Sequence, residues 1–139
     1  METKSRSFPL SAEGDFVRLT DKPLDLQVLI DKVRGSQYGA VTTFCGYVRD
    51  TEEGRPIQSI LYQAYSEMAI QEMNQIVWEA QARWPVRIAL EHRTGKVEVG
   101  EPSVIIASAG EHRQEAFDAC QYVINELKSR VPIWKVRYE

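Results

Sequence analysis

The clearest pattern in the chain is an apolar stripe with helical spacing in its last third. Between Gly110 and Arg130, apolar side chains recur at positions i, i+1, i+4, i+7, i+8 and i+11: Ala116, Phe117, Cys120, Val123, Ile124 and Leu127. This spacing predicts a helix with one buried face. Because Pro132 cannot continue a helix, residues 133–135 are predicted to follow as a short extended segment.

Two other apolar stripes predict two more helices. The first follows the start signal Asp21-Lys22-Pro23 and stops at Gly35. The second is predicted to be capped by Ser66 and to end at Trp84-Pro85. Their apolar faces are Leu26, Leu29, Ile30 and Val33 in the first helix, and Ala69, Met73, Ile76, Val77, Ala80 and Trp84 in the second.

Strands are predicted where β-branched and aromatic residues gather or where apolar and polar residues alternate. These segments are residues 15–20, 39–49, 57–65, 86–93, 96–99 and 103–108. Gly46 indicates a bulge or a close backbone approach. The polar residues 50–56 are predicted to be a flexible connection, so that 39–49 and 57–65 form a hairpin with a long loop. Residues 103–108 are apolar enough to lie in the centre of a sheet.

In this order the elements predict one α+β domain over residues 1–139, with three helices packed on a mixed, mostly antiparallel sheet. A hydrophobic content of 43% in 139 residues is enough for a core of this kind. Residues 1–14 are polar and rich in turn formers, and they are predicted to be flexible.

Composition narrows the function classes. A net charge of −3 and a pI near 5.5 argue against nucleic-acid binding, which needs a basic face. The chain lacks a long apolar run and the apolar core of a signal peptide, so it is predicted to be a cytoplasmic protein that does not bind membranes. Cys45 and Cys120 are predicted to be buried small hydrophobes, and the residues predict no metal site and no cofactor motif.

Candidate chemistry gathers around the last helix. His112 and Arg113 lie at its start, where free backbone N–H groups and the helix dipole favour an anion. Lys128 lies near its end, and the turn at Pro132 can bring Lys135 back beside it. The spacing therefore allows these four cations to converge on one site.

Structural roles are open for the same residues. Lys128 and Arg130 also complement the helix dipole in the last turn, and spacing alone favours that interpretation. Arg49, at a strand end beside a polar loop, is either a ligand contact or a solvated charge. The residues alone favour the solvated charge, and they favour a packed role for His92 at the end of its strand.

Several short motifs, specific only when read together, resemble one enzyme family. They extend from about Gly39 to Lys135 and comprise Gly39-Ala-Val-Thr-Thr-Phe44 with Gly46 and Val48-Arg49, Leu61-Tyr62 with Tyr65, Met68-Ala69, Arg83-Trp84-Pro85, His92-Arg93 with Gly95, Gly100-Glu101, His112-Arg113, Leu127-Lys128 and Pro132-Ile133-Trp134-Lys135. The chain resembles the catalytic (large) subunit of molybdopterin synthase. It departs from the family pattern at Gln63, Gly110 and Val136-Arg137.

The resemblance implies an α/β hammerhead fold and a sulfurtransferase of molybdenum cofactor biosynthesis that needs no metal and no cofactor. It also implies a homodimer with a small ubiquitin-like sulfur-carrier subunit at each end, giving a heterotetramer. In this family, sulfur passes from the thiocarboxylate at the carrier's C-terminal Gly-Gly tail to cyclic pyranopterin monophosphate. The product carries the dithiolene of molybdopterin.

By matching position, the resemblance implies that Lys128 and Lys135 are the catalytic lysines. It implies that Arg49, His112 and Arg113 bind the substrate and that Phe44 lines the pocket. A second function class stays open, in which a non-catalytic α+β homodimer uses the same cations to bind a small anionic metabolite or a protein tail.

Overall fold

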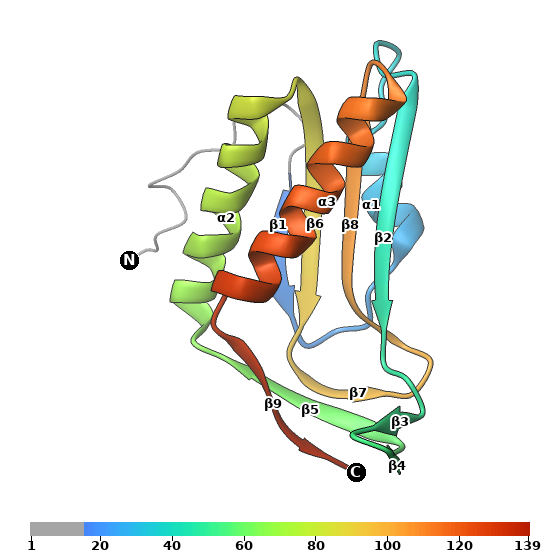
Figure 1. Cartoon of the computed structure of the whole chain (residues 1–139), viewed down its shortest axis with the longest axis vertical. Coiled ribbons are helices and arrows are strands. Elements are labelled where there is room, and N and C mark those ends of the chain that lie inside the picture. Colours follow the sequence, from blue (N-terminus) through green and yellow to red (C-terminus); the bar gives the residue numbers. More distant parts are fainter. Residues whose placement is uncertain (1–15) are drawn as a thin grey trace.

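The computed structural model describes residues 16–139, so the predicted flexible segment 1–14 and the first residue of the first predicted strand lie outside it. The main sheet has four strands in the order β1-β6-β8-β2 (Figure 1). β1 pairs with β6 in parallel, and the other two pairs are antiparallel. The strands are β1 (Phe16–Thr20), β2 (Ala40–Tyr47), β6 (Val86–Arg93) and β8 (Pro102–Gly110).

A second, three-stranded antiparallel sheet has the order β7-β5-β9 and lies beyond one end of the first (Figure 1). Its strands are β5 (Ser59–Ala64), β7 (Gly95–Glu98) and β9 (Ile133–Tyr138). Two short strands, β3 (Thr51–Glu52) and β4 (Arg55–Pro56), pair only with each other. The helices are α1 (Leu26–Val33), α2 (Ser66–Arg83) and α3 (Arg113–Arg130), so the predicted α+β class with three helices and mostly antiparallel strands is confirmed.

The helices cover both faces of the main sheet, with α2 and α3 on one face and α1 on the other (Figure 1). Alternate residues of β8 serve the two faces, since Val104 and Ile106 pack in the cluster under α2 and α3, whereas Ile105 and Ala107 pack in the cluster under α1. This double burial confirms the prediction that β8 lies in the centre of the sheet.

Gly46 combines both features that the sequence indicated. The pairing of β2 with β8 shifts register between Gly46 and Tyr47, which marks an irregularity. A Cβ atom on Gly46 would lie 2.9 Å from Cγ1 of Val104 on the neighbouring strand. A larger residue here would force β2 away from β8.

The predicted hairpin between residues 39–49 and 57–65 is wrong. β2 pairs with β8 in the main sheet, whereas β5 pairs with β7 and β9 in the second sheet. The connection expected to be flexible forms the small β3–β4 hairpin, which carries the chain from one sheet to the other. Alternation identifies a strand but not its partner.

Two details of the predicted helices also need correction. Phe117 is 51% exposed, because the buried face of α3 is formed by Ala116, Ala119, Cys120, Val123 and Leu127 and leaves Phe117 at its margin. Ser66 is the first residue of α2 rather than its cap, and the N-cap residue Tyr65 makes no side-chain capping bond.

Candidate active site

Lys128 and Lys135 line one pocket of about 190 Å³ between the end of α3 and the start of β9. The helix ends at Arg130, the chain turns at Pro132, and β9 then pairs with β5 so that Lys135 lies opposite Tyr62. Local chain geometry thus brings the two ammonium groups together. The other lining residues are Tyr62, His92, Leu127, Val131, Ile133 and Trp134.

The environment of Lys128 disfavours its charged form. Burial of the ammonium group by surrounding protein is the larger cause, and the charge of Lys135 is the second, so the pKa of Lys128 lies below its usual range. Lys128 nevertheless keeps access to solvent. A lysine of this kind can release and take back a proton more readily than a surface lysine.

His92 is a functional candidate that the sequence assigned only to packing. Its ring is 5% exposed and packs edge-on against Tyr62, with 5.5 Å between the ring centroids. Nδ1 lies 2.7 Å from the carbonyl oxygen of Arg93, so Nδ1 carries the proton and Nε2 is left as an acceptor. His92 therefore fills a packed position and gives the pocket a neutral ring beside Lys128.

Burial lowers the pKa of His92 to about 4, and the nearby charge of Lys128 acts in the same direction. The unfolded chain therefore binds a proton between roughly pH 6.5 and 4 that the folded chain rejects, so this residue lowers stability as the pH falls through that window. The loss should reach about 3 kcal/mol near pH 4. We expect His92→Gln to flatten the pH dependence of urea unfolding between about pH 6.5 and pH 4. Parallel curves for wild type and His92→Gln would contradict this.

Arg130 has a structural role. Its guanidinium contacts Glu72 at 2.9 Å and Glu79 at 2.7 Å, both on α2, and Glu126 at 3.0 Å on α3 itself. These bonds lower the pKa of Glu79 to about 2. Arg130 thus ties the two helices together, whereas Lys128 two residues earlier faces the pocket, so the two last-turn cations have different surroundings.

Arg49 does not line the lysine pocket, but a residue that sequence reasoning missed, Glu52, lies between it and Lys135. The Arg49 side chain is 77% exposed and lies 4.0 Å from a carboxylate oxygen of Glu52, whose other oxygen is 3.1 Å from Nζ of Lys135. Glu52 therefore bridges the two cations. The sequence signal was weak, because Glu52 is one of several acidic residues in a polar connection.

His112 and Arg113 lie at the other end of α3. Fifteen helical residues separate Arg113 from Lys128 along the sequence, which corresponds to roughly 22 Å. His112 is 78% exposed, and its backbone N–H donates to Glu115 at 2.8 Å, which closes the helix start. Neither residue lines the lysine pocket, so the predicted convergence of four cations is wrong within one chain.

Phe44 is also absent from the described residues that line this pocket. Its side chain packs against the main core cluster instead. Cys120 is buried as predicted, and burial raises its pKa to about 11. Cys45 is partly buried, and burial raises its pKa too, so neither thiol is poised as a nucleophile.

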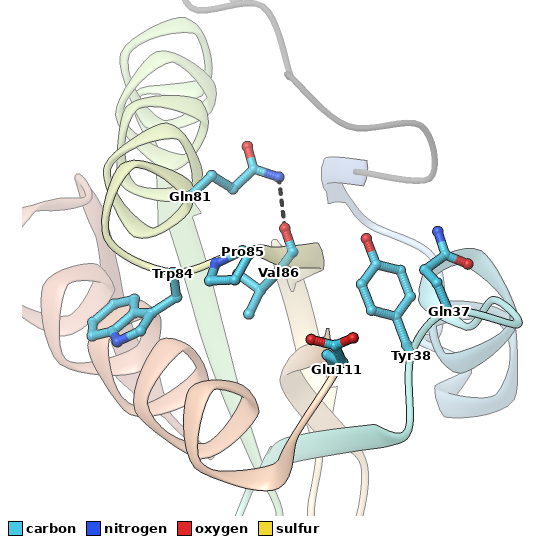
Figure 2. A pocket seen from close by; sticks show the side chains of 7 residues that line it. All are labelled: Gln37, Tyr38, Gln81, Trp84, Pro85, Val86 and Glu111. Atoms are coloured by element: carbon cyan, nitrogen blue, oxygen red, sulfur yellow. Dashed lines mark hydrogen bonds between the residues drawn. The ribbon is translucent and has the colours of Figure 1, made fainter.

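A larger cavity of about 370 Å³ lies at the opposite end of the main sheet, where α2 ends and β2 and β6 begin (Figures 1 and 2). Figure 2 shows the side-chain amide of Gln81 donating a hydrogen bond to the backbone carbonyl of Val86. The described lining contains one carboxylate, Glu111, and no cation, so the cavity lacks the charge to hold an anion. Its described lining is Gln37, Tyr38, Gln81, Trp84, Pro85, Val86 and Glu111.

Two features are absent from residues 16–139. No helix in this range is both long and apolar enough to cross a membrane. No three His, Cys, Asp or Glu side chains within it gather in a way that could hold a metal ion.

Fold and pocket together define a small α+β protein with a pocket lined by two lysines. More specifically, the chain belongs to the MoaE protein family, whose model matches residues 19–130. It is 43% identical over 122 residues to the molybdopterin synthase catalytic subunit of Pyrococcus abyssi, covering 86% of this chain and 82% of that protein. The protein of the same name from Drosophila erecta is 39% identical over 123 residues. The match covers 87% of the present chain but only 34% of the Drosophila protein.

Solved structures agree with this assignment. Molybdopterin synthase from Staphylococcus aureus matches with a TM-score of 0.81 at 29% identity over 90% of each chain. A complex of subunits 1 and 2 of molybdopterin-converting factor from Helicobacter pylori matches with a TM-score of 0.73 over 86% of this chain and 82% of that one. At 24% identity the second likeness shows the fold alone. The family resemblance read from the sequence is confirmed.

Proposed function

We propose that this chain is the catalytic subunit of a molybdopterin synthase. It transfers sulfur from the C-terminal thiocarboxylate of a small carrier protein to cyclic pyranopterin monophosphate, forming the dithiolene of molybdopterin. The observation that carries the proposal is the pocket shared by Lys128 and Lys135 in a member of the MoaE family. We place the reaction in the cytoplasm, since Cys45 and Cys120 are both free thiols.

The pocket suits two anionic reactants. The donor carries a thiocarboxylate and the acceptor a phosphate, and charge-assisted bonds from ammonium and guanidinium groups hold such anions well. Lys135 is a donor for the anion, and Lys128, with its lowered pKa, is the residue that exchanges protons as sulfur adds and oxygen leaves. The neutral His92 adds an acceptor without adding charge.

The size of the pocket supports a carrier tail as one ligand. At about 190 Å³ it is smaller than the roughly 300–1,000 Å³ of ordinary small-molecule sites. A Gly-Gly tail has no side chains and therefore fits a narrow pocket that ends at two cations. The Helicobacter pylori structure is a complex of two subunits, and we propose a corresponding small partner for this chain.

A homodimer would complete the site. Lys128 and Arg113 are too far apart along α3 to share one substrate within a chain. We propose that two copies pair so that the lysine pocket of one faces His112 and Arg113 of the partner subunit. Phe117, one helical turn after Arg113 and half exposed, gives this end of the helix an apolar surface for such a contact.

A reconstitution assay tests the function. The purified chain, a thiocarboxylated carrier and cyclic pyranopterin monophosphate are expected to give a dithiolene pterin, detected after oxidation as its fluorescent derivative. The same mixture with a carrier that ends in an ordinary carboxylate is expected to give none. If the chain binds both ligands and yields no dithiolene, it is a non-catalytic binding homodimer.

A further inference from the structure

Glu52 is an acidic residue whose carboxylate contacts Lys135, one of the two lysines of the pocket, while Glu52 itself lines a separate cavity. Its side chain is 15% exposed, with Oε2 at 3.1 Å from Nζ of Lys135 and Oε1 at 4.0 Å from Nη2 of Arg49. One carboxylate thus spans a proposed catalytic lysine and a proposed substrate-binding arginine. In the free chain, two of the cations that an anionic ligand needs are already engaged.

The local backbone holds Glu52 in this place. β3 and β4 pair across a two-residue turn, Glu53-Gly54, in which both residues have positive φ (52° and 79°). Such turns join strands tightly, because their twist matches that of a hairpin. A left-handed conformation is unfavourable for Glu53, so the hairpin keeps a small backbone cost next to Glu52.

We propose that Glu52 occupies the carboxylate subsite of this pocket in the free chain and is displaced by the C-terminal carboxylate or thiocarboxylate of the sulfur donor. The inference rests on the function proposed above. Both groups are planar anions that bind the same cations, and two of them at Lys135 and Arg49 would repel each other. Glu52 therefore competes with the donor and sets the affinity for it.

The structure provides a place for the displaced side chain. A cavity of about 300 Å³ borders the hairpin and is lined by Glu52, Glu53, Arg55, Pro56, Ile57, Tyr138 and Glu139. Arg55 lies directly opposite Glu52 in the β3–β4 ladder, where cross-strand side chains are close enough to interact. Rotation of the Glu52 side chain can thus move its carboxylate from Lys135 to Arg55 without opening the hairpin.

The sign of one mutational effect on ligand Kd distinguishes competition by Glu52 from positioning of Lys135 by Glu52. If Glu52 competes, Glu52→Gln keeps the shape of the side chain, frees both cations and tightens the binding of a carboxylate ligand. We expect roughly a two- to five-fold lower Kd, the scale of one partly exposed ion pair. If Glu52 instead positions Lys135 for the ligand, the same substitution weakens binding.

The test is a chemical-shift titration of the ¹⁵N-labelled chain with a synthetic peptide that ends in Gly-Gly with a free carboxylate. Glu53→Gln is the matched control, since it removes the same charge from the adjacent residue, and its Kd is expected to stay within about two-fold of wild type. The peptide with a C-terminal amide should bind wild type and Glu52→Gln equally.

An unchanged or higher Kd for Glu52→Gln, an equal gain for Glu53→Gln, or no binding by any variant would overturn the proposal. The titration contains no pterin and measures no turnover. A negative titration would therefore overturn the role of Glu52 but not the proposed dithiolene formation. A negative reconstitution assay would overturn the proposed function, and the titration would still measure peptide binding.

Discussion

Replacing Lys128 with alanine is expected to slow single-turnover sulfur transfer by about 10²-fold or more, the usual size of an acid–base contribution. Lys128 shares its pocket with Lys135, and burial together with that neighbouring charge lowers its pKa. The ammonium group is thus prepared to give up a proton, and alanine cannot replace it. The rate of dithiolene formation is measured with the thiocarboxylated carrier already bound and in excess, so that binding does not limit it.

Lys128→Arg separates proton transfer from charge. Guanidinium keeps the positive charge but does not deprotonate near neutral pH, so it should restore little of the rate. Lys32→Ala, on α1 across the sheet, should retain the rate of the wild type. A nearly fully active Lys128→Arg variant would show that Lys128 anchors an anion and transfers no proton. The same two substitutions at Lys135 then show whether the two lysines divide the work.

The helices and the lysine pair could be predicted because they depend on local chemistry. The periodicity of Ala116, Cys120 and Val123 defines the buried face of α3 at any packing geometry. Pro132 keeps the helix from continuing, and the chain turns into β9 within a few residues, which brings Lys135 to the same pocket as Lys128. Few conformations are sterically open to such a segment, so the sequence alone indicates that Lys135 can lie near Lys128.

Strand pairing and the missed site residues depend on contacts between distant segments. Residues 57–65 are predicted to pair with 39–49, but their pattern does not specify a partner, and the packing of the whole domain selects β7 and β9. His92 reaches the pocket because β6 ends beside α3, and Glu52 reaches Lys135 across 83 positions of sequence. No local pattern contains this information.

The false convergence of the four cations has a different cause. The sequence already contained the length of this helix. A helix of 18 residues is roughly 27 Å long and holds its two ends apart. His112 and Arg113 therefore belong to a separate surface within one chain. If they serve the same reaction as Lys128, a second copy of the chain has to supply them, and that requirement leads to a decisive experiment.

Mixed dimers of two inactive variants are expected to recover activity. In the proposed arrangement each site takes Lys128 from one copy and Arg113 from the other. Lys128→Ala alone should lose about 10²-fold in rate, and Arg113→Ala should bind substrate roughly ten- to a hundred-fold more weakly through the loss of a phosphate contact. A dimer with one chain of each kind contains one intact site, because the unaltered Lys128 of one chain meets the unaltered Arg113 of the other.

Co-expression of the two variants at equal levels should therefore give about a quarter of the wild-type rate, since half of randomly formed dimers are mixed and each has one intact site of two. Purification through two different tags should raise this to about half. Lys128→Ala with Lys135→Ala is the matched control, because both residues line the same pocket and every site in their mixed dimer lacks one lysine. The proposal fails if the pair Lys128→Ala with Arg113→Ala recovers no more activity than this control does. Arg113 and Lys128 would then act within one chain or in unrelated sites, and the two copies would share no site.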